Sequence, residues 1–174
     1  MAVLWQISRE SILKDDRIVV CRLFSRYSGD VEPRWPIIMG LGEKFQMLVG
    51  YLKKSSDQEN FFAKRGLEVF YISNKKYFRA FNIFAIFKLA RILREKNVDI
   101  LHCHKHQSYV YGSIAAKLAK VPVVIAHVHG MNRSKGLRRK FINRIIAKRI
   151  DRIITVGDEV REDILANFPG VGGD

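Results

Sequence analysis

The chain has 174 residues, of which 48% are apolar and 28% are charged. That length allows one domain with a sizeable core and is too short for two ordinary domains. The composition is typical of a soluble globular protein. No apolar run reaches the roughly 18–20 residues of a membrane-spanning helix, and the first eight residues lack the pattern of a signal peptide. We therefore expect neither a membrane span nor a secretory leader.

Basic residues dominate the charge, since 31 Lys and Arg against 17 Asp and Glu leave a net charge of +14. A field of that sign attracts polyanions, which include nucleic acid, anionic lipid and phosphorylated ligands. The charge alone does not choose among these partners.

Short β-rich runs alternate with longer stretches of helical apolar spacing. In chain order we expect a strand at 3–8, a helix at 17–27, a strand at 35–40, a mostly helical stretch at 45–65 that breaks near 54–57, a strand at 68–72, a helix at 81–96, a strand at 100–104, a helix at 108–119, a strand at 123–128, a basic helix at 136–149, a strand at 152–156 and a helix at 158–166.

This alternation predicts one α/β domain over residues 1–174, with a Rossmann-like, doubly wound and mainly parallel sheet and helices on both faces. Connections between such parallel strands are right-handed. Ligands of these sheets bind at the carboxyl ends of the strands, so the residues that follow each strand are the candidates for function.

All five histidines follow two consecutive predicted strands. His102, His104 and His106 lie at or after the end of the 100–104 strand, and His127 and His129 lie at the end of the 123–128 strand. Residues two apart in a strand share a face, so both groups are expected to reach one crevice.

Three interpretations of these histidines stay open. They are packing or capping residues, metal ligands in a His-x-His spacing, or a polar site for a sugar hydroxyl or a phosphate. Against a metal stand the lack of nearby Asp or Glu and the opposite facing of Cys103. The polar site is favoured for His129, because Gly130 after it permits a turn and close approach of the backbone to a ligand. Nothing in the sequence requires a metal or a cofactor.

Three stretches carry a family resemblance: VDILHCHKH, SYVYGSIAAKLAKVPVVIAHVHG and DRIITVGDEVREDIL. In this order they resemble the N-terminal domain of family-4-type retaining glycosyltransferases. These enzymes have the GT-B fold, in which two Rossmann-like domains enclose a cleft. The resemblance covers nearly the whole chain and is strongest over residues 98–165.

The resemblance implies roles for particular residues. It places His129 at the sugar-donor site near the reaction centre, with His127 as a less favoured neighbour, and matches His104 to a histidine after the fourth strand. The family's loop after its first strand corresponds here to residues 8–17, which lack the usual glycines and offer Arg9, Lys14 and Arg17 instead.

The resemblance also implies that the chain is the acceptor-side half of a glycosyltransferase. A C-terminal domain absent from this chain would bind the nucleotide-sugar, so the chain alone is expected to be inactive. The implied acceptor is lipid-linked or part of a surface glycan, and His104, His106 and residues 8–17 would shape the acceptor side of the site. The alternative is a non-catalytic acceptor- and membrane-binding subunit that recruits a separate donor-binding subunit.

Two basic segments indicate a membrane partner. Residues 133–152 hold nine basic residues, Arg138, Arg139 and Lys140 among them, and Lys75, Lys76 and Arg79 mix with aromatic residues before the 81–96 helix. Such patterns are typical of interfacial segments at anionic lipid, although the apolar side of the basic helix is expected to pack on the sheet. We expect a cytoplasmic protein, peripheral on the inner face of the membrane. Nucleic-acid binding is less favoured, because no known binding motif is present.

Overall fold

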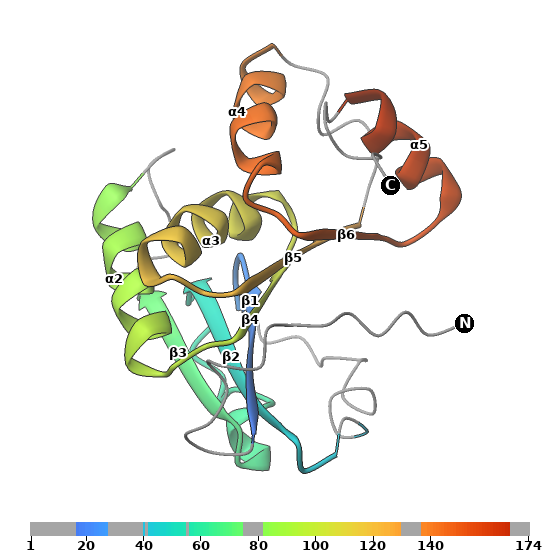
Figure 1. The fold of residues 1–174 in the computed structure, drawn as a ribbon. Helices are drawn as coiled ribbons and strands as arrows, with labels where there is room; N and C mark the ends of the chain where they lie inside the picture. The colour runs from blue at the N-terminus through green and yellow to red at the C-terminus, as the bar shows by residue number, and fades with distance from the viewer. Residues whose placement is uncertain are drawn as a thin grey trace.

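The computed structural model of the protein describes residues 17–27, 40, 42–54, 56–74, 82–129 and 137–167. Six strands form one sheet in the order β3-β2-β1-β4-β5-β6 (Figure 1). All five neighbouring pairs are parallel. The strands are β1 (Ile18–Phe24), β2 (Phe45–Lys53), β3 (Glu68–Ser73), β4 (Ile100–His104), β5 (Val123–Val128) and β6 (Arg152–Thr155).

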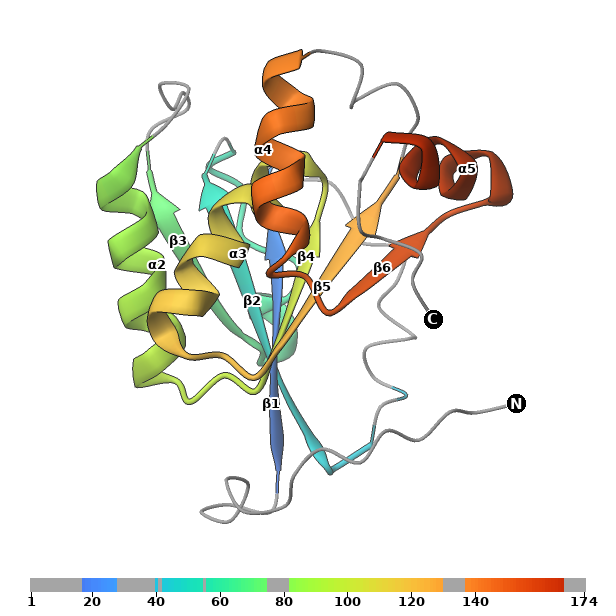
Figure 2. The same cartoon turned by 45° about the horizontal axis from the view of Figure 1, so that its top comes forward.

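Three α-helices and one short 3₁₀ helix connect the described strands, and a fourth α-helix follows β6. They are η2 (Ala63–Arg65), α2 (Ile83–Glu95), α3 (His106–Ala119), α4 (Leu137–Ala147) and α5 (Asp158–Asn167). Figure 2 shows α2 and α3 side by side in front of the sheet, with α4 beside α3. Helix α2 begins at a capped end, since the side chain of Asn82 accepts a hydrogen bond from the Ala85 N–H at 3.2 Å. Within the described residues, none of these helices is long and apolar enough to cross a bilayer.

The larger hydrophobic core lies between the sheet and the α-helices. Alternate strand residues such as Leu23, Leu101 and Cys103 point into it. Each α-helix supplies buried residues to the same cluster, including Leu89 of α2 and Tyr111 of α3. This layer is the helix-covered face of the sheet.

A second, smaller core lies on the opposite face, over β1 and β2. It contains Val20, Met47, Val49 and Tyr51 and is closed by Phe62, which directly precedes η2. The predicted fold class, a Rossmann-like α/β domain with a parallel sheet, is therefore confirmed. In the described part, α-helices cover one face and the η2 segment packs on the other.

Two predicted helices are wrong, because residues 18–24 and 45–53 are the neighbouring central strands β1 and β2. Both strands are buried on two sides, so their apolar residues do not alternate, and such an uninterrupted apolar run also fits helical spacing. The strands and helices predicted from residue 68 onward are confirmed within a few residues. The predicted strand at 3–8 lies outside the described residues, and so does the predicted strand at 35–40 except for Gly40, which is a turn residue.

Candidate functional site

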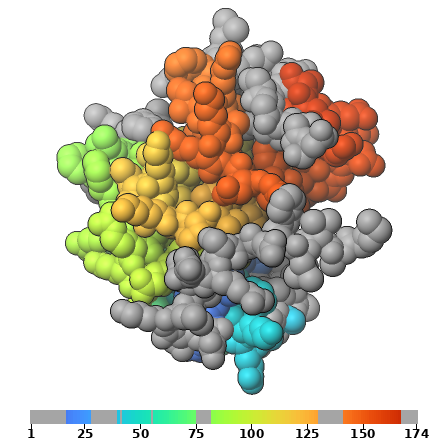
Figure 3. Space-filling view, in the orientation of Figure 1, coloured from blue at the N-terminus to red at the C-terminus, as the bar shows by residue number. Residues whose placement is uncertain are grey.

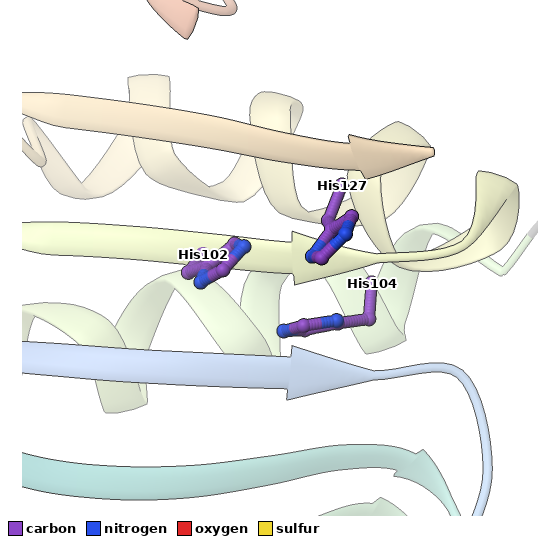
Figure 4. Close-up of side chains that lie close together, drawn as sticks. All are labelled: His102, His104 and His127. Atoms are coloured by element: carbon purple, nitrogen blue, oxygen red, sulfur yellow. The ribbon is translucent and has the colours of Figure 1, made fainter. Parts of the chain in front are cut away.

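Four histidines meet at the carboxyl edge of the sheet. Strands β4 and β5 are neighbours, and His104 is the register partner of His127. His102 and His104 share one face of β4, while Cys103 between them points into the helix-side core. Figure 4 shows the rings of His102, His104 and His127 gathered on the side of the strands away from the helices. The predicted meeting of the two histidine pairs is therefore confirmed.

The histidine rings are in direct contact with one another. Ring centroids lie 4.3 Å apart for His102 and His104, and 5.1 Å apart for His104 and His127. The rings of His127 and His129 stack with centroids 4.3 Å apart. We call His102, His104, His127 and His129 the histidine cluster. His104 is only 1% exposed, whereas His102, His127 and His129 are half-buried.

His104 is held in the cluster by contacts on two sides. The buried guanidinium of Arg22 in β1 lies with Nε 3.3 Å and Nη2 3.2 Å from His104 Nε2. On the other side, His104 Nδ1 lies 3.5 Å from His129 Nε2. The ring of Phe24 stacks on His104 with centroids 4.5 Å apart. These contacts fix the plane of the imidazole.

His104 remains neutral in this environment. Burial lowers the pKa of His104 far below its usual value, and neighbouring His102 and the positive charge of Arg22 lower it further. A guanidinium only donates hydrogen bonds, so His104 Nε2 accepts and the ring's single hydrogen lies on Nδ1.

The turn from β4 to α3 is strained at Lys105. This residue has φ 70° and ψ 161°, a region of backbone conformation that is nearly restricted to glycine. The turn is held by a hydrogen bond from the Lys105 N–H to the His127 carbonyl at 3.2 Å. The Ser108 hydroxyl also lies against the carbonyls of His104 and Lys105. These contacts tie the first turn of α3 to the carboxyl ends of β4 and β5.

His106 is directed away from the histidine cluster. As the first residue of α3, it places Nε2 3.2 Å from Oδ1 of Asn143, a fully buried residue of α4. Its ring also meets Tyr109 edge-on. The structure therefore joins His106 to the packing of α3 against α4, and its predicted role in substrate binding stays a prediction.

Three cluster members also have the spacing of metal ligands, since ligand atoms of His102, His104 and His127 lie within 4.8 Å of one another. Metal binding requires neutral imidazoles with available lone pairs. However, His104 Nε2 accepts from Arg22 and its Nδ1 faces His129. A cation would also sit beside a buried guanidinium, which opposes it. The set therefore does not fit a resident metal ion.

Of the predicted phosphate loop at residues 8–17, the structure describes only Arg17. The first described strand is β1, and the segment after its carboxyl end begins at Ser25. Arg17 precedes β1 at the amino edge of the sheet, opposite the histidine cluster. The other predicted residues of this segment, Arg9 and Lys14, lie outside the described residues.

The structure does not describe several further predicted site residues, or does not describe their side chains. Gly130, Lys75, Lys76 and Arg79 lie outside the described residues, and Arg138, Arg139 and Lys140 lie on α4 without described side chains.

The basic helix α4 packs as the sequence predicts, at Ile146 and, partly, at Ile142. It nevertheless leaves Phe141 and Ile145 exposed.

Arg22 and Lys105 are the site residues that sequence reasoning missed. Arg22 was hidden by the helical interpretation of residues 17–27. Its signal was a charged residue inside the apolar run IVVCRLF, which is unusual for a buried strand. The strain at Lys105 left no signal in the sequence, because lysine is not a residue that favours positive φ.

A parallel Rossmann-like sheet with a polar cluster at its carboxyl edge is the architecture expected of one domain of the GT-B fold. Residues 52–171 match Glycosyltransferase Family 4. The chain therefore belongs to Glycosyltransferase Family 4, and the resemblance inferred from the three sequence stretches is confirmed.

A curated relative supports the same assignment. The chain is 32% identical over 84 residues to the UDP-Gal:alpha-D-GlcNAc-diphosphoundecaprenol alpha-1,3-galactosyltransferase of Escherichia coli. The aligned part is 45% of this chain and 22% of that protein.

Solved structures share the fold at low identity. Anabaena Alr3699/HepE in complex with UDP and glucose matches with a TM-score of 0.59 and 14% identity, over 89% of this chain and 41% of that one. UDP-GlcNAc 2-epimerase from Methanocaldococcus jannaschii matches with a TM-score of 0.58 and 11% identity, over 86% of this chain and 42% of that one. Because an epimerase and a protein in complex with UDP and glucose share it, the fold alone does not fix the reaction.

Proposed function

We propose that this chain is the acceptor-side domain of a glycosyltransferase that moves a sugar from a nucleotide-sugar to a lipid-linked acceptor. The observation that carries the proposal is the histidine cluster at the carboxyl edge of β4 and β5, in a chain that belongs to Glycosyltransferase Family 4. A second, donor-binding domain completes the site, either in the same polypeptide or as a separate subunit.

His129 is the residue that reaches the substrate in this proposal. It is half-buried and directly follows the last residue of β5, where ligands of parallel sheets bind. It hydrogen-bonds the transferred sugar or orients the acceptor hydroxyl. His104 is too deeply buried for such a contact and acts through His129.

The donor and acceptor classes rest on the relatives. The Escherichia coli protein is named for a UDP-galactose donor and a diphosphoundecaprenol-linked acceptor, and the Anabaena structure holds UDP and glucose. We therefore propose a UDP-sugar donor and a polyprenyl-diphosphate-linked saccharide acceptor. The nucleotide itself contacts mainly the second domain.

A lipid-linked acceptor requires the site to approach a membrane, and α2 offers a surface for that contact. Its first turns expose Ile83, Phe84 and Phe87, and Phe84 is 80% exposed. In Figure 3, α2 lies at the margin of the molecule. Helix α2 follows β3, so its amino end lies toward the carboxyl edge of the sheet, the edge that holds the histidine cluster.

The charge of α2 suits anionic lipid. The helix carries Lys88, Arg91 and Arg94 against Glu95 as its one acidic residue, within a chain of net charge +14. Exposed aromatic residues beside basic ones are the pattern of an interfacial anchor. We propose peripheral attachment at the cytoplasmic face of the membrane, with α2 in the interface.

The proposed reaction is tested by a transfer assay on the protein that unites this chain with its donor-binding domain. A series of UDP-sugars is offered with a polyprenyl-diphosphate-linked N-acetylglucosamine acceptor, and the lipid product is identified by mass spectrometry. We expect transfer from one donor and none by the 174-residue chain alone. Epimerisation of UDP-GlcNAc without transfer, or vesicle binding without any reaction, would overturn the proposal.

A further inference from the structure

A chain of polar contacts runs from the interior of the sheet to His129, a half-buried member of the histidine cluster. Arg22 on β1 is 6% exposed and contacts His104 on β4. His104 in turn contacts His129 after β5. Three segments far apart in sequence thus form one row, Arg22–His104–His129.

The direction of each hydrogen bond in this row follows from its first member. Arginine stays protonated at any pH at which the protein folds, and it has donors only. Its Nε and Nη2 atoms lie 3.3 Å and 3.2 Å from His104 Nε2, so this nitrogen is the acceptor. A neutral imidazole has one N–H, which His104 therefore carries on Nδ1.

The same logic extends to the last member. His104 Nδ1 lies 3.5 Å from His129 Nε2, and since Nδ1 is the donor, His129 Nε2 is the acceptor. The hydrogen of a neutral His129 then lies on Nδ1. Adding a proton to His129 Nε2 would set two N–H groups against each other.

We propose that Arg22 is a positioning residue that fixes the tautomer of His129 through His104. His129 is thereby held as a hydrogen-bond donor at Nδ1, with Nε2 turned inward to His104. The tautomers stand on the geometry alone, whereas their use in sugar transfer rests on the proposed function.

The packing supports a fixed row rather than a chance contact. The Phe24 ring lies within 15° of parallel to His104 and holds its plane. Arg22 lies over the same Phe24 ring, 5.6 Å from its centroid, and the His127 ring stacks on His129. Each ring in the row therefore has an aromatic neighbour that limits its rotation.

The test is the protonation state of each ring nitrogen, read from long-range proton–nitrogen NMR spectra of the ¹⁵N-labelled chain. Histidine-to-glutamine variants assign the signals. We expect hydrogen on Nδ1 of both His104 and His129 in the unaltered protein. Hydrogen on Nε2 of either ring would overturn the proposal, and this outcome needs no Arg22 variant to fold.

Variants then isolate the role of Arg22. In Arg22→Met we expect the Nε2–H tautomer of His104 to appear and the His129 signals to change with it. Arg22→Lys restores a donor and should return the spectrum toward that of the unaltered protein. Arg26→Met removes an exposed guanidinium shortly after the same strand and should change neither ring. Unchanged tautomers in folded Arg22→Met would refute the positioning role.

These results separate the inference from the proposed function. If the tautomers are as expected but the protein transfers no sugar, the inference about the Arg22–His104–His129 row holds and its role in sugar transfer is refuted. If the protein transfers sugar but His129 carries its hydrogen on Nε2, the proposed function holds and the positioning role of Arg22 is refuted.

Discussion

The face of the sheet opposite the α-helices has two halves with opposite chemistry. Over β1 and β2, Val49 and Tyr51 pack beneath Phe62 in an apolar cluster. Over β4 and β5, the same face carries the histidine cluster. The boundary runs along β1, where Phe24 stacks on both Tyr51 and His104.

The apolar half stabilises the fold, whereas the histidine half is the candidate functional site. Apolar burial stabilises the fold by about 25 cal/mol per Å², whereas burying polar rings is unfavourable unless they are hydrogen-bonded. The half of the sheet face that carries the histidines therefore stabilises the fold less than an apolar cluster at the same place would. Such local departures from an optimal core are expected at functional sites.

The largest expected effect belongs to the apolar half. Phe62→Ala removes a ring that is 1% exposed, so we expect a loss of about 3–5 kcal/mol in the free energy of unfolding. Urea denaturation measures it. The matched control is Phe61→Ala, since Phe61 is only partly buried beneath the Arg65 guanidinium, and its loss should be clearly smaller. Equal losses would show that Phe62 does not close the core.

A pH effect follows from the histidine half. The lowered pKa keeps folded His104 neutral. In the unfolded chain, the pKa of this histidine is about 6.5. Below that pH the unfolded state binds a proton that the folded state does not. Stability should therefore fall as pH falls, by up to about 1.4 kcal/mol per pH unit from this residue.

Denaturation between about pH 7 and about pH 5 measures that slope. His104→Gln keeps an acceptor for Arg22 but does not titrate, so its stability should fall less steeply with pH. Identical slopes for the two proteins would mean that His104 is not buried in the neutral form.

A third effect concerns the exposed turns of α2. Phe84→Ser with Phe87→Ser should weaken binding to vesicles of anionic lipid by about tenfold or more, since each ring loses its transfer to the interface. Co-sedimentation measures it, and added salt should weaken the remaining binding. Phe141→Ser, an exposed aromatic residue of α4, is the matched control. An equal loss in that variant would place the anchor on α4 instead.

The smallest expected effect is on the free energy of unfolding and comes from a substitution in the histidine half. His102→Leu replaces a polar ring on the sheet by an apolar side chain. We expect stability to stay level or rise by about 0.5–1 kcal/mol, the opposite sign to Phe62→Ala. A loss of the size seen at Phe62 would show that the histidine half is itself a structural core.

The sequence predicted the half of the chain from Glu68 onward well and the earlier part poorly. Strands β4 and β5 are separated by one clear helix, α3, and the histidines at their ends indicate the site. Strands β1 and β2 have uninterrupted runs of buried residues and are covered on both faces. Periodicity does not separate such strands from buried helix.

The composition of the site was predictable only in part. The pairing of His104 with His127 follows from strand order and the two-residue period. The contact between Arg22 and His104 depends on which strand lies beside β4. That neighbour is β1, from 80 residues earlier, and no local pattern identifies it.

The central claim is that the histidine cluster is the site of sugar transfer, and His129→Ala tests it most directly. In the enzyme united with its donor-binding domain, we expect kcat to fall by about 10²-fold or more, with the free energy of unfolding nearly unchanged. Lys117→Ala, an exposed residue of α3, should retain full activity. Near-normal turnover by folded His129→Ala would contradict the account.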